Sequence, residues 1–228
     1  DGRMVSQKSL TKIHLNTCPT ADELAGLNIG DVVYLNGLVY TARESVYTGV
    51  LDGDLEIPSE FNISEGANFH CSPAANQHED GSFSLGAVSA TASFRFSKWI
   101  GRWLEKTKSK IVIGKGGMST NDYAKHFVPN KTIYLTTVGY GTGALLGRGV
   151  KKVKSLYWKK ELGLAQAMWV LEVKNFGPFL VECDIKGNSL FEREHKKISL
   201  KIDKIYEGTR PAILKRLGET DDRKDELI

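Results

Sequence analysis

The stretch KIVIGKGGMS, Lys110–Ser119, decides the fold. Its first part, KIVIG, is a short run of mostly β-branched apolar residues, which predicts a buried strand. Ser119 is a preferred residue at the start of a helix, so we expect a helix from residue 119 to residue 127. A buried strand that passes through glycines into a helix is typical of α/β proteins.

The flanking segments show which kind of α/β protein to expect. SATASFRFSKWIGRWLE, Ser89–Glu105, has apolar residues at helical spacing and predicts an amphipathic helix. TIYLTTV, 132–138, predicts the next strand. VVYLNGLVYTAR, Val32–Arg43, predicts a β-hairpin that turns at Asn36 and Gly37. Hairpins together with strand–helix alternation predict a mixed sheet covered by layers of helices.

Length and composition are those of an ordinary globular protein. The chain has 228 residues, of which 41% are hydrophobic, and we expect a single domain over residues 1–228 with a frayed charged tail at 219–228. The net charge of +4 suits an anionic ligand, and we do not expect nucleic acid as a partner. No apolar run approaches the roughly 18 residues of a membrane span, so no membrane association is expected.

The cysteines indicate the kind of compartment. Cys18, Cys71 and Cys183 are far apart in the sequence, and no CxxC motif occurs. The chain therefore offers no self-contained zinc or iron–sulfur motif. An odd number of cysteines without close pairs favours a reducing, cytoplasmic location.

The glycine-rich loop around Lys115 is a candidate anion site. Glycines allow the backbone to approach a ligand closely, and Lys115 adds a full positive charge. The P-loop spacing is absent, because position 109 is serine, and the dinucleotide spacing fails at Ser119. A tight turn with a solvated lysine explains the sequence equally well.

Two further cations stand at the predicted ends of elements. Arg43 follows the second strand of the predicted hairpin, although a surface pair with Glu44 is an alternative. Thr91 stands near the start of the predicted helix with Arg95 one turn later, although helix capping with a surface arginine is an alternative. Convergence of Arg43, Arg95 and Lys115 near the Thr91 hydroxyl would suit a small dicarboxylate.

Four segments in order carry a resemblance to a known family. They are GDVVYLNGLVYTAR, TASFRF, VIGKGGM and ELGLAQAMWVLEVKNFGPFLVECDIKGNSLF. They resemble the β subunit, or the equivalent C-terminal domain, of class I fumarase and L(+)-tartrate dehydratase, which are iron–sulfur hydro-lyases. The resemblance covers about residues 28–195.

The resemblance implies a swivelling β/β/α domain that is active only with a partner. The partner, an α subunit or an N-terminal domain of a longer chain, would bind a 4Fe-4S cluster, and the assembly would be a hetero-oligomer. Arg43, Arg95 and Lys115 would bind substrate carboxylates, and Thr91 and Lys115 would be catalytic, with Thr91 as the proton-transferring base. The implied reaction is reversible hydration of fumarate to malate, with dehydration of L(+)-tartrate or another hydroxy diacid as an alternative.

The chain departs from the family pattern beside these residues. The family usually reads RDxAH where this chain has Arg43-Glu44-Ser45-Val46-Tyr47, and GPTT where it has Ser89-Ala90-Thr91-Ala92. These changes leave open which diacid is the substrate. They also keep open a non-catalytic anion-binding or assembly module of the same fold, and nucleotide binding is a weaker alternative.

Overall fold

The computed structural model describes residues 12–139, 141–202, 204 and 207–208. The chain divides into two units between Glu192 and Arg193. The predicted frayed tail, residues 219–228, lies outside the described residues.

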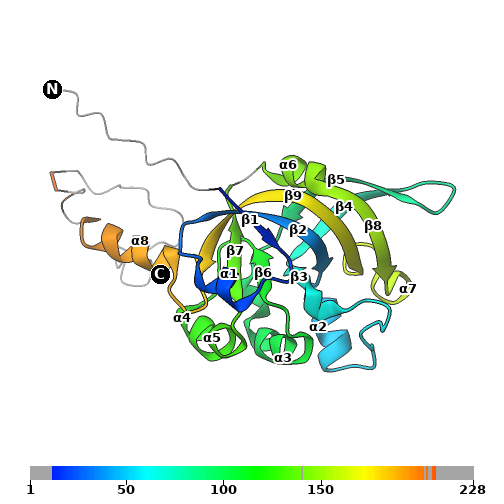
Figure 1. Ribbon diagram of the computed structural model, residues 1–228, viewed down its shortest axis with the longest axis horizontal. Coiled ribbons are helices and arrows are strands. Elements are labelled where there is room, and N and C mark those ends of the chain that lie inside the picture. The colour runs from blue at the N-terminus through cyan, green and yellow to red at the C-terminus, as the bar shows by residue number, and fades with distance from the viewer. Residues whose placement is uncertain (1–11, 140, 203, 205–206, 209–228) are drawn as a thin grey trace, which may run out of the picture. The chain divides into compact units, whose positions relative to one another are not determined.

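A seven-stranded mixed sheet forms the body of the first unit (Figure 1). Its strand order is β1-β2-β3-β6-β7-β9-β8, and β2 also pairs with β9. The pairings of β2, β3, β6, β7 and β9 therefore close into a ring. Neighbours among β1, β2, β3, β6 and β7 run parallel, whereas β9 runs antiparallel to β2, β7 and β8. The predicted α/β class with a mixed sheet is confirmed. The bounds are β1 Lys12–Asn16, β2 Val32–Thr41, β3 Gly66–Phe69, β6 Ile111–Gly114, β7 Ile133–Thr137, β8 Val150–Tyr157 and β9 Met168–Cys183.

The predicted hairpin at Asn36 and Gly37 is wrong, because β2 runs through both residues as one strand. Its first half pairs with β1, its second half pairs with β3, and β9 follows the opposite edge. Gly37 has φ +123°, and the register with β9 shifts between Leu35 and Gly37. The Asn-Gly pair thus makes an irregularity within a strand, where the left-handed backbone region again requires glycine.

The predicted helix over Ser89–Glu105 begins later than expected. β4 (Cys71–Gln77) and β5 (Phe83–Ala90) form an antiparallel pair, and this pairing takes Ser89 and Ala90 into a strand. A 3₁₀ turn, η2 (Phe94–Phe96), leads into helix α3 (Ser97–Thr107). The apolar periodicity of α3 is real, but cross-strand bonds to β4 override it at the N-terminal end.

The helix predicted after the glycine loop is confirmed. Ser119 caps α4 (Thr120–Asp122) by accepting from the Asp122 N–H, and Asp122 bonds back to the Ser119 N–H. The helix continues through a π-helical turn, η3, to residue 130. The bounds of the other helical elements are α1 Ala21–Ala25, α2 Glu44–Leu51, η1 Ile63–Glu65, η3 Tyr123–Phe127, α5 Val128–Asn130, α6 Gly143–Gly149, α7 Lys159–Leu162 and α8 Leu190–Ser199.

The core has two kinds of layer, because side chains alternate along each strand. Side chains on one face of these strands fill the interior of the ring. They include Leu35, Phe69, Ile113 and Phe179. The opposite face meets α2, α3 and η3, where large aromatic side chains, among them Trp103, are buried. Each strand is therefore fixed from both sides, and the loops at the strand ends stand on a packed base.

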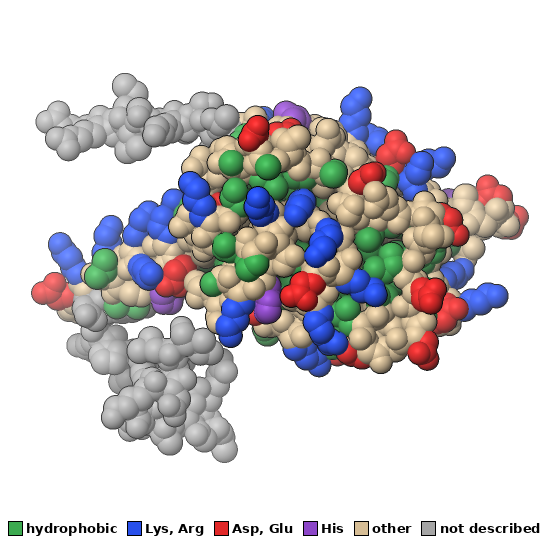
Figure 2. Space-filling model, turned by 60° about the horizontal axis from the view of Figure 1, so that its bottom comes forward, with side chains coloured by type: hydrophobic (Ala, Val, Ile, Leu, Met, Phe, Trp, Pro, Cys, Tyr) green, Lys and Arg blue, Asp and Glu red, His purple; other side chains and the backbone are tan. Residues whose placement is uncertain are grey.

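The surface over the helices carries both signs of charge. Figure 2 shows Lys and Arg side chains interspersed with Asp and Glu on the face that includes the helical layer. No helix among the described residues is long and apolar enough to cross a membrane.

Candidate active site

The carboxyl ends of the parallel strands bring the predicted cations to one edge of the sheet. Thr41 of β2, Phe69 of β3 and Ile113 of β6 are paired in one row across the sheet. Arg43 and Lys115 each stand two residues beyond this row. Since β2, β3 and β6 are parallel neighbours, Arg43 and Lys115 lie beyond the same edge of the sheet. The carboxyl ends of parallel strands are where α/β proteins commonly bind ligands.

Thr91 fills the gap between the ends of β3 and β6. Its N–H donates to the His70 carbonyl at 2.7 Å, and its own carbonyl accepts the N–H of Lys115 at 3.2 Å. The N–H of Ser93 then donates to the Lys115 carbonyl at 3.2 Å. Thr91 and Lys115 are thus joined through their main chains.

Arg95 completes this group, because its Nη2 donates to the Thr91 hydroxyl. Three of the four predicted site residues, Thr91, Arg95 and Lys115, therefore lie together. The geometry differs from the prediction in one respect, since Thr91 stands in a loop after β5 and not at the start of a helix.

Arg43 lies on the same edge, at the residue that precedes α2. Its Nη1 donates to the Ala165 carbonyl at 3.2 Å, whereas its buried Nε has no hydrogen-bond partner among the described residues. Burial raises the pKa of the neighbouring Cys71 thiol, and the charge of Arg43 partly opposes that rise. A buried guanidinium N–H without an acceptor is costly, which makes this a place where a ligand acceptor would stabilise the structure.

A buried hydrogen-bond chain lies beneath these residues. The Tyr47 hydroxyl accepts from Asn68 Nδ2 and bonds to His70 Nε2, both at 2.7 Å, and His70 Nδ1 bonds to Ser93 Oγ at 2.7 Å. Ser93 Oγ bonds in turn to the Tyr134 hydroxyl at 2.6 Å. Burial lowers the pKa of His70 to about 3, so the ring is neutral and carries one proton to share along the chain.

Tyr47 is a departure from the family pattern, and the structure places it in the core. The side chain is completely buried, and its ring contacts those of Trp99 and Trp103 of α3. The altered residue therefore acts on the site through His70 and Ser93, and it does not line the surface. Burial also raises the pKa of the Tyr47 hydroxyl, which keeps it protonated.

The glycine loop rests on buried polar residues that sequence reasoning missed. The Met118 N–H donates to the Tyr123 hydroxyl at 2.8 Å, and that hydroxyl donates to the Glu182 carboxylate. A carboxylate within the apolar run FLVEC was the available signal for Glu182. Ser93 and Tyr134 carried no comparable signal, since a serine near a helix start and a tyrosine in a strand are common.

The described residues offer no metal centre of their own. No group of three or more His, Cys, Asp or Glu side chains within them is arranged to hold a metal ion. Cys71 and Cys183 are buried, whereas Cys18 is exposed, and none of the three is in a disulfide.

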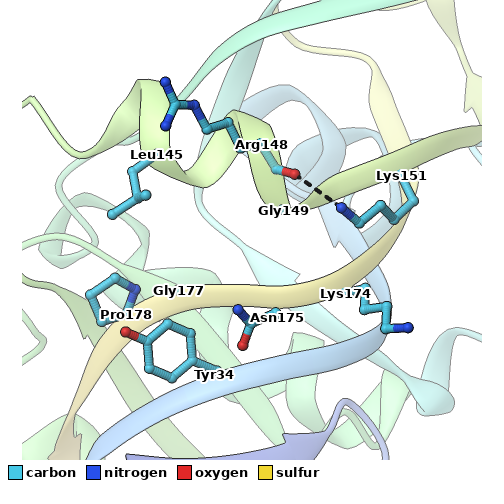
Figure 3. Close-up of a pocket in the computed structure, with 9 residues that line it drawn as sticks. All are labelled: Tyr34, Leu145, Arg148, Gly149, Lys151, Lys174, Asn175, Gly177 and Pro178. Carbon is cyan, nitrogen blue, oxygen red and sulfur yellow. Dashed lines mark hydrogen bonds between the residues drawn. The ribbon is translucent and has the colours of Figure 1, made fainter.

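A hollow lies between α6 and β9 (Figure 3). It has a volume of about 290 Å³, and its lining includes Arg148, Lys151 and Lys174. The Lys151 amine donates to the Arg148 carbonyl at 3.3 Å. Figure 3 shows the Arg148 and Lys174 side chains pointing in different directions, so these cations do not converge on one ligand.

Comparison with known proteins gives consistent relatives. The family described as "Fumarase C-terminus" matches residues 2–194. The chain is 33% identical over 189 residues to "Putative L(+)-tartrate dehydratase subunit beta" of Methanocaldococcus jannaschii, covering 82% of this chain and 94% of that protein. It is 30% identical over 195 residues to "L(+)-tartrate dehydratase subunit beta" of Escherichia coli K12, covering 85% and 93%. It is 29% identical over 188 residues to "Putative fumarate hydratase class I" of Geobacillus stearothermophilus, covering 82% of this chain and 35% of that protein.

Proposed function

Because the chain belongs to the fumarase C-terminal family, we propose that it is the β subunit, or the equivalent domain, of an iron–sulfur hydro-lyase. The substrate is a small dicarboxylate that is hydrated or dehydrated reversibly. This chain supplies the groups that grip the carboxylates and move the proton, and a partner supplies the rest of the site.

One observation carries this proposal. Arg95 donates to the Thr91 hydroxyl, and the Lys115 backbone bonds to the Thr91 backbone, at the sheet edge that also carries Arg43, although up to 72 residues separate these positions in sequence (115 − 43). Fixed cations beside a hydroxyl suit the recognition of two carboxylates on one small molecule.

The chemistry follows from where charge develops. When a proton leaves the carbon next to a carboxylate, negative charge builds up on that carboxylate. Arg43 and Lys115 follow strand ends, and Arg95 lies in the 3₁₀ turn η2 and bonds to Thr91, so these cations stabilise this charge with little reorganisation during the reaction. A bound 4Fe-4S cluster would supply a Lewis-acidic iron for the departing hydroxyl.

Thr91 Oγ1 is the proposed acceptor of that proton. A threonine hydroxyl is a poor base at its ordinary pKa, so it needs cationic surroundings to take this role. The hydrogen bond from Arg95 to Thr91 Oγ1 supports the assignment, because a donated bond from a cation stabilises a deprotonated oxygen.

We propose that the cluster belongs to an α subunit, or to an N-terminal domain of a longer chain, and that the assembly is a hetero-oligomer. The relatives that the chain matches over most of their length are named as β subunits, which supports a separate partner chain. A cytoplasmic location is proposed from the three free cysteines.

Two substrate pairs remain as candidates. Fumarate and malate are favoured by the similarity to a class I fumarate hydratase, whereas L(+)-tartrate is favoured by the β-subunit relatives. The shared chemistry is loss of water from a C4 hydroxy diacid.

The test is an anaerobic screen of the chain co-purified with its cluster-bearing partner. Fumarate, mesaconate and L(+)-tartrate are offered to the complex and to the isolated chain. We expect the complex to turn over at least one diacid and the isolated chain to turn over none. A complex that retains its cluster but hydrates or dehydrates no diacid would support the non-catalytic anion-binding module instead.

A further inference from the structure

The backbone of the glycine loop is seated on two buried tyrosines. The Met118 N–H donates to the Tyr123 hydroxyl at 2.8 Å, and the Gly117 backbone partly opposes the rise that burial causes in the pKa of Tyr134. Both tyrosine side chains are fully buried. Met118, three residues after Lys115, is therefore fixed by a side chain of η3.

Glu182, near the end of β9, holds this support in place. Its carboxylate accepts from the Tyr123 hydroxyl and from Ser189 Oγ at 2.5 Å. Burial raises the pKa of Glu182, and these donors partly oppose the rise. Burial and the neighbouring Glu182 also raise the pKa of Tyr123, so this tyrosine stays protonated and keeps donating.

The loop fits this support closely enough that only glycine is accommodated. Gly117 has φ +74°, and a Cβ at that position would lie 3.0 Å from the Tyr123 hydroxyl and 3.2 Å from Glu182 Cδ. The backbone of the loop at Gly117 and Met118 thus lies directly against the Tyr123 hydroxyl and the Glu182 carboxylate. A change in the support would shift the loop directly, because no intervening side chain absorbs the movement.

The same support reaches Thr91 by a second route. The Tyr134 hydroxyl bonds to Ser93 Oγ at 2.6 Å, and the Ser93 N–H donates to the Lys115 carbonyl at 3.2 Å. The Lys115 N–H donates to the Thr91 carbonyl. Tyr123, through Met118, and Tyr134, through Ser93, therefore both help to fix the Lys115 backbone relative to Thr91.

We infer that Tyr123 and Glu182 are positioning residues for Lys115, which they hold at the distance from Thr91 that substrate binding requires. The inference rests on the proposed function, since it concerns how the same site is aligned. Neither side chain touches the substrate. Their effect passes through the Met118 N–H and the backbone of the loop.

The test compares Tyr123→Phe with Tyr40→Phe in the complex with the cluster-bearing partner. Tyr40 is a matched control, because it is completely buried and its hydroxyl bonds to Ser109 Oγ at 2.7 Å and to Trp103 Nε1 at 3.2 Å. We expect Tyr123→Phe to lower kcat/KM about 10- to 100-fold, with a raised KM because Lys115 grips the substrate carboxylate. Tyr40→Phe should leave both constants as in the wild type.

Amide hydrogen exchange gives a readout that does not depend on turnover. In Tyr123→Phe the Met118 amide should exchange at least about 10-fold faster, since it loses its acceptor. Exchange at amides of β2 and α3 should not change. If Tyr123→Phe folds poorly, Glu182→Gln replaces it, because the amide keeps the shape but weakens the bond to Tyr123.

The outcomes separate this inference from the function on which it rests. Wild-type kcat/KM and wild-type exchange at Met118 in Tyr123→Phe overturn the positioning role, if Lys115→Ala is inactive in the same assay. If Lys115→Ala is itself fully active, the proposed role of Lys115 fails and the positioning role fails with it.

Discussion

At the scale of single residues, Tyr47 near the candidate site is buried in the core and hydrogen-bonded there. The resemblance drawn from the sequence marks Tyr47 as a departure from the family pattern, and the Tyr47 hydroxyl bonds to the ring of His70. Gly114 leaves space for the buried hydrogen bonds that continue from His70, since a Cβ at this position would lie 1.9 Å from Ser93 Oγ and 2.4 Å from the Tyr134 hydroxyl. The residues that hold Thr91 and Lys115 from below therefore form one connected polar layer.

His70 makes the free energy of unfolding depend on pH. Its folded pKa of about 3 lies below the value of about 6.5 for an unfolded histidine, so the unfolded chain binds the proton first. The stabilising effect of neutral His70 is fully present above pH 6.5 and is lost as the pH falls toward 3. We expect the free energy of unfolding to decrease over this range.

Denaturant unfolding of the wild type and of His70→Gln checks this prediction. Between pH 7 and pH 5 the carboxylates contribute least to the pH dependence of the free energy of unfolding. In this range the free energy of unfolding of His70→Gln should depend less steeply on pH than that of the wild type. The variant is expected to be less stable at pH 7, because it breaks the bonds to Tyr47 and Ser93. Equal slopes in the two proteins would contradict a neutral buried His70.

At the scale of elements, local signals predicted the structure where no distant strand competes. The capping residue Ser119 and the apolar run Ile111–Gly114 specify their elements by themselves, and both predictions are confirmed. The Asn36-Gly37 pair and the apolar periodicity from Ser89 gave wrong boundaries. In both places, strands far away in sequence, β9 and β4, supply backbone partners that a local pattern does not reveal.

The irregularity within β2 is a testable consequence of this competition. Gly37 has φ +123°, and an added Cβ would lie 2.4 Å from Thr17 Oγ1, which itself accepts the Leu38 N–H. We expect Gly37→Ala to lower the free energy of unfolding by about 2–4 kcal/mol through backbone strain and crowding.

Gly86→Ala in β5 is the control for this substitution. A Cβ at Gly86 meets its nearest atoms at 3.8 and 3.9 Å, so this change should lie within about 0.5 kcal/mol of the wild type. Equal stability of the two variants in urea unfolding would show that Gly37 is an ordinary strand residue.

At the scale of the whole molecule, the closing of the sheet into a ring explains why the site forms. β2, β3 and β6 are parallel neighbours, so Arg43 and Lys115 reach the same edge although they belong to separate parts of the sequence. The cations were visible in the sequence, and their likeness to a known family suggested a shared role. The strand order was not visible, because it depends on pairings between residues far apart along the chain.

The buried support of the site was also beyond the reach of sequence patterns. Tyr123, Tyr134 and Glu182 come from three different elements and meet only in the folded chain. A prediction from local periodicity assigns each of them to a strand or helix face, but it does not reveal that they share one contact under a loop.

The central claim is that Lys115 serves substrate carboxylate binding in a site that the partner completes. Its most direct test is kcat/KM of Lys115→Ala in the cluster-loaded complex, with the surface variant Lys125→Ala of η3 as the control. We predict a loss of about 10²- to 10³-fold for Lys115→Ala and wild-type turnover for Lys125→Ala. Wild-type kcat/KM in Lys115→Ala would contradict the account.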